Sequence, residues 1–130
     1  MNDHLRDYFD QQLESVVAEL PPRVHQLLGE VPMYIEDYPS RKMMRELGIA
    51  YRAGLCGLYT GIPLTRRHVD QAGVLSDVIH IFREGVISLA SDARGKIDDT
   101  ALRNQSRITI LHELGHHHGL DEDELEALGY

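Results

Sequence analysis

Two histidines four residues apart, with a glutamate directly after the first, stand near the end of the chain. They are His112 and His116, and with Glu113 they form the pattern His-Glu-x-x-His. On a helix, residues four apart lie on one face, so both imidazoles can reach one metal ion. Glu113 lies beside that face and can take a proton from water at the metal. The pattern therefore predicts a metal site, with zinc as the metal, and a carboxylate base.

The residues after the second histidine extend this pattern. Gly119 can adopt a left-handed backbone conformation, so the helix can end there and the chain can turn back. That turn makes Glu122 the preferred third metal ligand. Asp121 is an alternative ligand, although with Glu124 it also resembles a capping box for a last short helix. Asp123 or water are the remaining candidates. Roughly one shuffled chain in a thousand, or fewer, would show the extended pattern by chance.

Two further histidines follow the second ligand directly. His117 lies one helical turn after Glu113, so it can line the rim of the site, orient that carboxylate or face solvent. His118 falls outside the ligand face and is interpreted as a structural or solvent-facing residue. Neither is predicted to bind the metal.

His80 is the other histidine of interest. It lies in the segment Val78–Phe82, which is rich in β-branched residues and predicts a strand. A half-buried core histidine is the favoured interpretation. If the strand borders the cleft, His80 or Arg83 could contact substrate or stabilise an oxyanion. The remaining histidines are predicted to lie on the surface: His4, His25 and His68.

The rest of the chain must position the metal site. The patterns predict helices over residues 3–20, 24–28 and 41–47, strands over 31–37, 55–59 and 78–82, a turn at 83–85, and a loop over 91–96. Residues 86–89 fit either a hairpin strand or the start of a helix. Asp98 or Asp99 is expected to cap the helix that carries the motif, which runs to about His118. Its packing face is predicted from four residues: Leu102, Ile108, Leu111 and Gly115.

Composition narrows the class of protein. The chain has 130 residues, which predicts one domain, and its apolar content of 42% and charged content of 26% are typical of soluble proteins. A net charge of −8 argues against a nucleic-acid surface and fits a monomer or small oligomer. No apolar run is long enough to span a membrane, and the charged N-terminus lacks the apolar core of a signal peptide. The single cysteine, Cys56, cannot form an internal disulfide and is interpreted as a buried residue. We expect a cytoplasmic protein.

The chain resembles the small bacterial zincin-like metallopeptidase family, also called minimal zincins. Four segments carry the resemblance: residues 31–39, which include Glu36 and Asp37, then 58–65, 78–83 and 108–130. The resemblance implies an α/β (α+β) fold, in which residues 1–130 form a single domain. In that fold, a small mixed sheet packs against the helix that bears the motif.

The resemblance also assigns roles to the motif. It implies His112 and His116 as zinc ligands, Glu113 as the catalytic base and Glu122 as the third ligand. The family pattern has aspartate more often at that last position, so Glu122 departs from it in side-chain length. The motif is similar to that of metzincins as well, with an acid where they have a third histidine.

The sequence thus predicts a zinc-dependent peptidase that acts on a peptide or protein substrate. The alternative is a metal-binding or interaction protein without turnover. The small size motivates it, since we expect no downstream subdomain that could form the far wall of a substrate cleft. A metal-dependent endoribonuclease is less favoured. One bacterial family with that role has histidines at the same spacing but lacks the glutamate, whereas this chain has Glu113 and is acidic.

Overall fold

The computed structural model describes residues 1–61 and 77–127. Its elements are, in chain order, α1 (Asp3–Glu19), α2 (Pro22–Leu28), β1 (Met33–Glu36), α3 (Arg41–Leu47), the 3-10 helix η1 (Arg52–Gly54), β2 (Gly57–Thr60), β3 (Val78–Phe82), α4 (Arg83–Ala90), α5 (Asp99–His117) and α6 (Glu122–Ala127). The predicted helices before β1, the capped helix before η1 and the three strands are all confirmed, with bounds that shift by a few residues.

The three strands form one mixed sheet in the order β1-β3-β2. β1 runs parallel to β3, with Tyr34 beside His80, and β2 runs antiparallel to β3, with Leu58 on the other side of His80. Alternate residues of β3 point to opposite faces, so Ile79 and Ile81 enter the core while His80 lies on the other face. The predicted α+β class with a small mixed sheet is confirmed.

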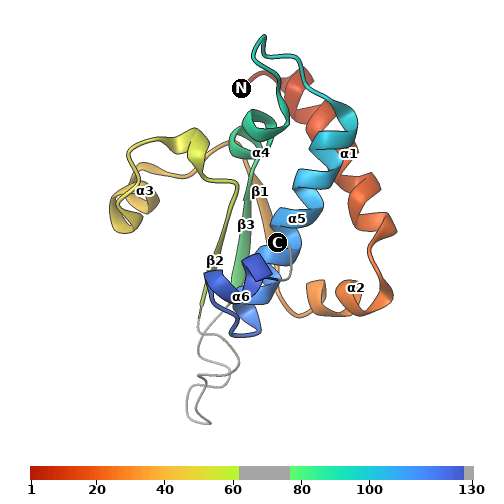
Figure 1. Cartoon of the computed structure of the whole chain (residues 1–130), viewed down its shortest axis with the longest axis vertical. Helices are drawn as coiled ribbons and strands as arrows, with labels where there is room; N and C mark the ends of the chain where they lie inside the picture. Colours follow the sequence, from red (N-terminus) through yellow and green to blue (C-terminus); the bar gives the residue numbers. More distant parts are fainter. Residues whose placement is uncertain (62–76, 128–130) are drawn as a thin grey trace.

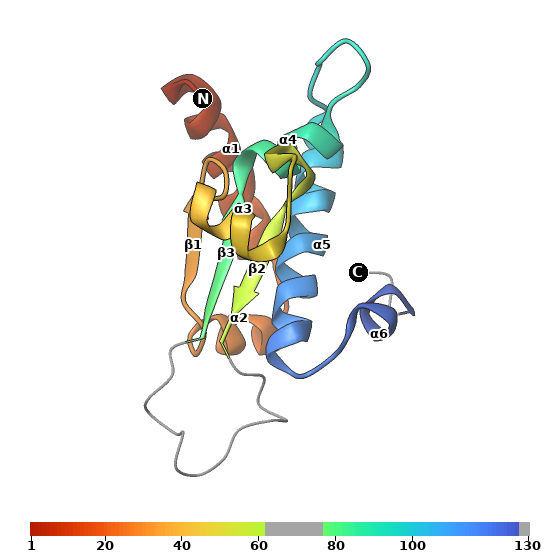
Figure 2. The ribbon, with the colours of Figure 1, turned by 90° about the vertical axis from the view of Figure 1, so that its left-hand side faces the viewer.

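The core lies between this sheet and the helices α1 and α5. It contains Phe9, Leu13 and Val16 from α1, and Leu102, Ile110 and Leu114 from α5, all buried. Figures 1 and 2 show α1 and α5 on one side of the strands and α3 on the other. The motif-bearing helix is therefore held along its length by both a helix and a sheet, which keeps its side chains in fixed positions.

One predicted turn is wrong. Residues 83–85 do not form a turn after β3, because α4 begins at Arg83 directly from the strand. Residues 86–89, for which the sequence allowed either a hairpin strand or a helix, are helical and belong to α4, which ends at Ala90. Gly85 allows this packing: a Cβ there would lie 2.1 Å from the carbonyl oxygen of Leu55. The glycine permits α4 to rest on the backbone that leads into β2.

The predicted packing face of α5 is only partly right. Leu102 and Gly115 are buried as expected, but Ile108 and Leu111 are only half-buried. Polar residues are buried in their place, among them Ser106 and Thr109. Their hydroxyl groups donate to the carbonyl oxygens of Leu102 and Gln105, four residues earlier, both at 2.8 Å. These bonds satisfy the hydroxyls inside the core, which a pattern of apolar residues does not reveal.

Within the described residues, no helix combines the length and apolar character needed to cross a bilayer.

Candidate metal centre

Helix α5 is defined by a cap at each end. At its start, the side chain of Asp98 accepts a hydrogen bond from the Ala101 N–H at 2.7 Å, which confirms one of the two predicted caps. At its end, Gly119 has a φ of 87°, so the predicted left-handed turn is present. The Leu120 N–H then donates to the Gly115 carbonyl and the Gly119 N–H to the His116 carbonyl. This is a Schellman motif, and it reverses the chain.

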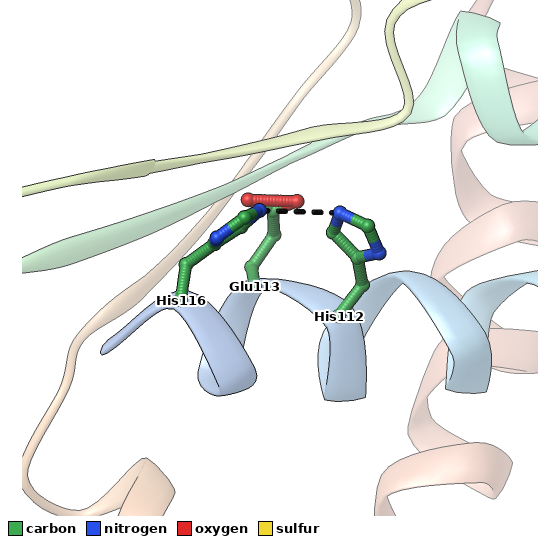
Figure 3. A group of neighbouring side chains, drawn as sticks. All are labelled: His112, Glu113 and His116. Atoms are coloured by element: carbon green, nitrogen blue, oxygen red, sulfur yellow. Dashed lines mark hydrogen bonds between the residues drawn. The ribbon is translucent and has the colours of Figure 1, made fainter. Parts of the chain in front are cut away.

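The reversal brings a third side chain to the two histidines. The Nε2 atoms of His112 and His116 lie 3.2 Å apart, and Glu122 Oε1 lies 2.8 Å from His116 Nε2 and 3.3 Å from His112 Nε2. Figure 3 shows both rings, with Glu113, on one side of α5 toward the strands. A point about 2 Å from all three atoms exists above a triangle of this size, and Zn²⁺ binds nitrogen and oxygen at that distance. The donor set therefore fits a zinc ion.

His116 is also held by the turn that follows it. Its Nδ1 lies 3.0 Å from the Leu120 carbonyl oxygen. A carbonyl oxygen only accepts, so Nδ1 is a donor here, and the lone pair of Nε2 would be the one that binds a metal ion. The turn thus orients the ring and leaves Nε2 ready to bind a cation. Sequence reasoning missed this contact, since the partner is a backbone atom.

The structure gives Glu122 and Asp121, the two candidates for the third metal ligand, different partners. The Glu124 N–H donates to Asp121 Oδ1 at 2.9 Å, and the Asp121 N–H donates to Glu124 Oε1 at 3.3 Å. This is the predicted capping box at the start of α6, and it engages the Asp121 carboxylate. Glu122, the first residue of α6, is the acid that faces the histidines. Partial burial acts to raise the pKa of Glu122, but His112 and His116 together hold it below its usual range.

Glu113 lies beside the same group of nitrogens. Each of the three residues His112, Glu113 and His116 has a ligand atom within 4.8 Å of those of the other two. The Glu113 side chain is buried, and the Tyr59 backbone N–H bonds to its carboxylate. Burial raises the pKa of Glu113, although both histidines and the Tyr59 N–H favour its ionised form. A raised pKa suits a carboxylate that must take up a proton.

Gly57 makes room for this carboxylate. A Cβ at that position would lie 2.8 Å from Thr109 Cγ2 and 3.2 Å from Glu113 Cγ. Strand β2 can therefore lie directly on α5, which brings the Tyr59 N–H to Glu113. Sequence reasoning missed this role, although a glycine within a strand often marks a close approach of another segment.

His117 is buried and paired with an acid. Its Nδ1 lies 2.8 Å from Asp77 Oδ2, and its ring packs edge-on against Tyr59 with the centroids 5.7 Å apart. Solvent exposure, one of three roles considered for this residue, is therefore wrong. The pair joins the last turn of α5 to the residue before β3. His118 is half-buried against the His117 ring, in keeping with a structural role.

A cleft of about 850 Å³ contains the candidate centre. One side is formed by α5 and the turn after it, and another by β2. A further part comes from Leu47 and Ile49, at the end of α3 and beyond it. Cys56 also lines the cleft and is half-buried, and its burial, with the charge of Glu113, raises the pKa of the thiol to about 11. The thiol is therefore protonated at neutral pH, which fits the expected packing role.

The other residues considered lie apart from this cleft. His80 is largely buried, and its Nδ1 lies 2.5 Å from Glu36 Oε1 on the sheet face away from α5. Arg83 pairs with Asp10 and Asp37. Neither is among the described residues that line the cleft. His4 and His25 are exposed as predicted, whereas His68 lies outside the described residues.

A family model described as zincin-like metallopeptidase matches residues 28–130. No curated protein matches the chain. Helix α1 lies outside the matched part, yet its Phe9, Leu13 and Val16 belong to the same core as α5.

Proposed function

The chain belongs to the zincin-like metallopeptidase family, and we propose that it is a zinc-dependent peptidase. His112, His116 and Glu122 hold the metal, and Glu113 is the general base. The observation that carries the proposal is the triangle of two Nε2 atoms and one Oε1 atom, with edges of 2.8–3.3 Å, beside a buried glutamate. We also propose that residues 1–130 form one domain, since α1 shares its core with α5.

The chain's own residues perform the proton transfers. The chemistry that bound zinc supplies is Lewis-acid polarisation of the attacking water and of the scissile carbonyl. Glu113 takes one proton from that water, then donates it to the nitrogen of the leaving amine and returns to a carboxylate. Burial raises the pKa of Glu113 and so favours its protonated form, which is the form that donates the proton. The Tyr59 N–H holds the carboxylate in place between the two transfers.

We propose a peptide or protein as substrate, zinc as the metal, and a cytoplasmic monomer or small oligomer. The cytoplasm is suggested by the single cysteine, Cys56, since stable domains in oxidising compartments commonly carry paired cysteines.

The test compares zinc-loaded wild type with a Glu113→Gln variant on a peptide library. Mass spectrometry detects the cleavage products, and metal analysis verifies equal zinc content in both proteins. We expect the substitution to lower the cleavage rate by about 10²–10⁴-fold while zinc stays bound, because glutamine keeps the shape but cannot take up the proton. Equal cleavage by both proteins would remove Glu113 from the mechanism.

The same experiment addresses the two rival functions. Zinc binding without cleavage of any peptide would favour the metal-binding protein without turnover. The cleft surface that Leu47 and Ile49 supply from upstream of the motif weighs against that hypothesis. The endoribonuclease has less support, since no lysine or arginine is found among the described residues of the cleft to contact phosphates.

A further inference from the structure

Helix α3 is well defined at both ends but contributes no buried residue. Ser40 Oγ accepts from the Met43 N–H at 3.1 Å, and Gly48 ends the helix with a φ of 67°. The chain therefore specifies a short helix whose apolar side chains stay outside the core. Apolar surface that is not buried adds little to the free energy of folding. The position of α3 calls for an explanation other than stability.

The end of α3 faces the candidate metal centre. Leu47, its last residue, is 45% exposed and lines the same cleft as His112 and Glu113. Ile49 lines it just after α3, Leu55 just before β2, and Ile108 from α5. We call these four aliphatic residues the apolar wall: Leu47, Ile49, Leu55 and Ile108. Ile108 lies one helical turn before His112, so this wall begins beside the proposed metal ligands.

A single exposed leucine is ordinary on a protein surface and does not indicate a binding site. Leu89, on α4, is 64% exposed and is not among the residues that line the cleft. Leu47 differs because the other members of the apolar wall reach the same cleft from separate segments of the chain. Figure 2 shows α3 in front of the strands, with α5 beside them. Convergence of aliphatic side chains beside a reactive centre is a feature of ligand pockets.

We propose that the apolar wall binds a large apolar side chain of the substrate close to the bond that is cut. The inference rests on the proposed function and specifies its substrate class: peptides with an aliphatic or aromatic residue next to the scissile bond. A substrate side chain that covers Leu47 removes apolar surface of both partners from water, so binding strengthens with the area covered. Leu47 and Ile49 are the residues that determine the preference for a large apolar side chain next to the scissile bond.

The test uses two peptide pools that differ at one central position, which holds leucine or phenylalanine in one pool and serine in the other. We expect zinc-loaded wild type to cleave the apolar pool about tenfold faster, at subsaturating peptide. The Leu47→Ser variant should lose most of this ratio. Leu89→Ser is the matched control and should keep it, since both leucines are exposed and only Leu47 lines the cleft. Thermal unfolding verifies that both variants fold.

Peptide binding separates this inference from the proposed function. Zinc-loaded Glu113→Gln protein, with and without Leu47→Ser, is titrated with each pool by calorimetry. Tighter binding of the apolar pool that depends on Leu47 supports the apolar wall, even if the wild type cleaves neither pool and the peptidase function fails. Cleavage of both pools at equal rates, or a ratio unchanged by Leu47→Ser, overturns the apolar wall while the peptidase function stands.

Discussion

Two groups of acidic residues in this molecule have different partners. At the carboxyl ends of β1 and β3, the ion-pair cluster consists of Arg6, Asp10, Asp37 and Arg83. Asp37 pairs with Arg6 at 2.8 Å and with Arg83 at 3.0 Å, and Asp10 pairs with Arg83 at 3.0 Å. In the cleft, Glu113 and Glu122 lie beside His112 and His116. None of the described residues that line the cleft is lysine or arginine.

The carboxyl groups reflect these surroundings in their pKa values. Hydrogen bonds and charge from Arg6 and Arg83 hold the pKa of Asp37 below its usual range, whereas burial raises that of Glu113. The ion-pair cluster is complete with the chain's own cations. The cleft has carboxylates and imidazole lone pairs but no permanent cation from the described residues. The cleft can therefore accept an added cation, whereas the ion-pair cluster already holds its own.

The largest expected effect is the response to zinc. With zinc at about a hundred times its dissociation constant, the free energy of unfolding of the wild type should rise by about 2.7 kcal/mol. His116→Ala should abolish most of this rise, because it removes one Nε2 ligand. Asp37→Asn is the control from the ion-pair cluster and should respond like the wild type. Thermal unfolding with and without zinc measures all three, and an unchanged rise in His116→Ala would contradict the assigned ligands.

The next effect comes from opening the ion-pair cluster. Arg83→Met removes a guanidinium whose side chain is only 13% exposed and which serves both Asp10 and Asp37. We expect a loss of about 2 kcal/mol in the free energy of unfolding, since hydrogen bonds to charged groups contribute roughly 1.5–3 kcal/mol. Denaturant titration measures the loss. Zinc binding should be unaffected, so a weakened zinc response would show that the two regions are coupled.

A smaller effect concerns acid stability. Because the folded-state pKa of Asp37 is lowered, its contribution is present above its ordinary value of 3.8 and is lost as the pH falls through the folded value. Asp37→Asn should therefore flatten the fall in stability below about pH 4, by at most about 1.4 kcal/mol per pH unit. Denaturant titrations over a pH series compare the two proteins. Equal slopes in acid would mean that Asp37 does not titrate as a paired carboxylate.

The smallest effect has the opposite sign and belongs to the cleft. The folded-state pKa of Glu113 is raised, so its contribution to stability is greatest below its ordinary value of 4.5 and is lost as the pH rises through the folded value. In metal-free protein at neutral pH, Glu113→Gln should therefore raise the free energy of unfolding by roughly 1 kcal/mol. This is the usual cost of burying a polar group whose hydrogen bonds to water are only partly replaced. The gain should shrink toward pH 4. Destabilisation of the variant at neutral pH would show that hydrogen bonds within the protein fully compensate the burial of the ionised Glu113 carboxylate.

Local rules explain how much of the site could be predicted. Helical spacing placed His112 and His116 on one face, and Gly119 marked the end of the helix, because both depend only on neighbouring residues. The rules failed where distant segments meet. Thr109 is buried where β2 lies on it at Gly57, and His117 is buried beside Asp77, with which it pairs. A pattern of apolar residues has no information about such partners.

The motif helix, its caps and the capping box of α6 follow from the sequence, because hydrogen bonds between near neighbours specify them. The three strands follow from their runs of apolar and β-branched residues. The tertiary structure alone decided that Glu122 rather than Asp121 faces the two histidines, because the Schellman turn sets the direction in which the chain returns. It also decided that Gly57 lets β2 lie against Glu113 and that α3 extends the cleft. The arrangements at Gly57 and at α3 depend on contacts between segments far apart in the chain, which residue spacing does not encode.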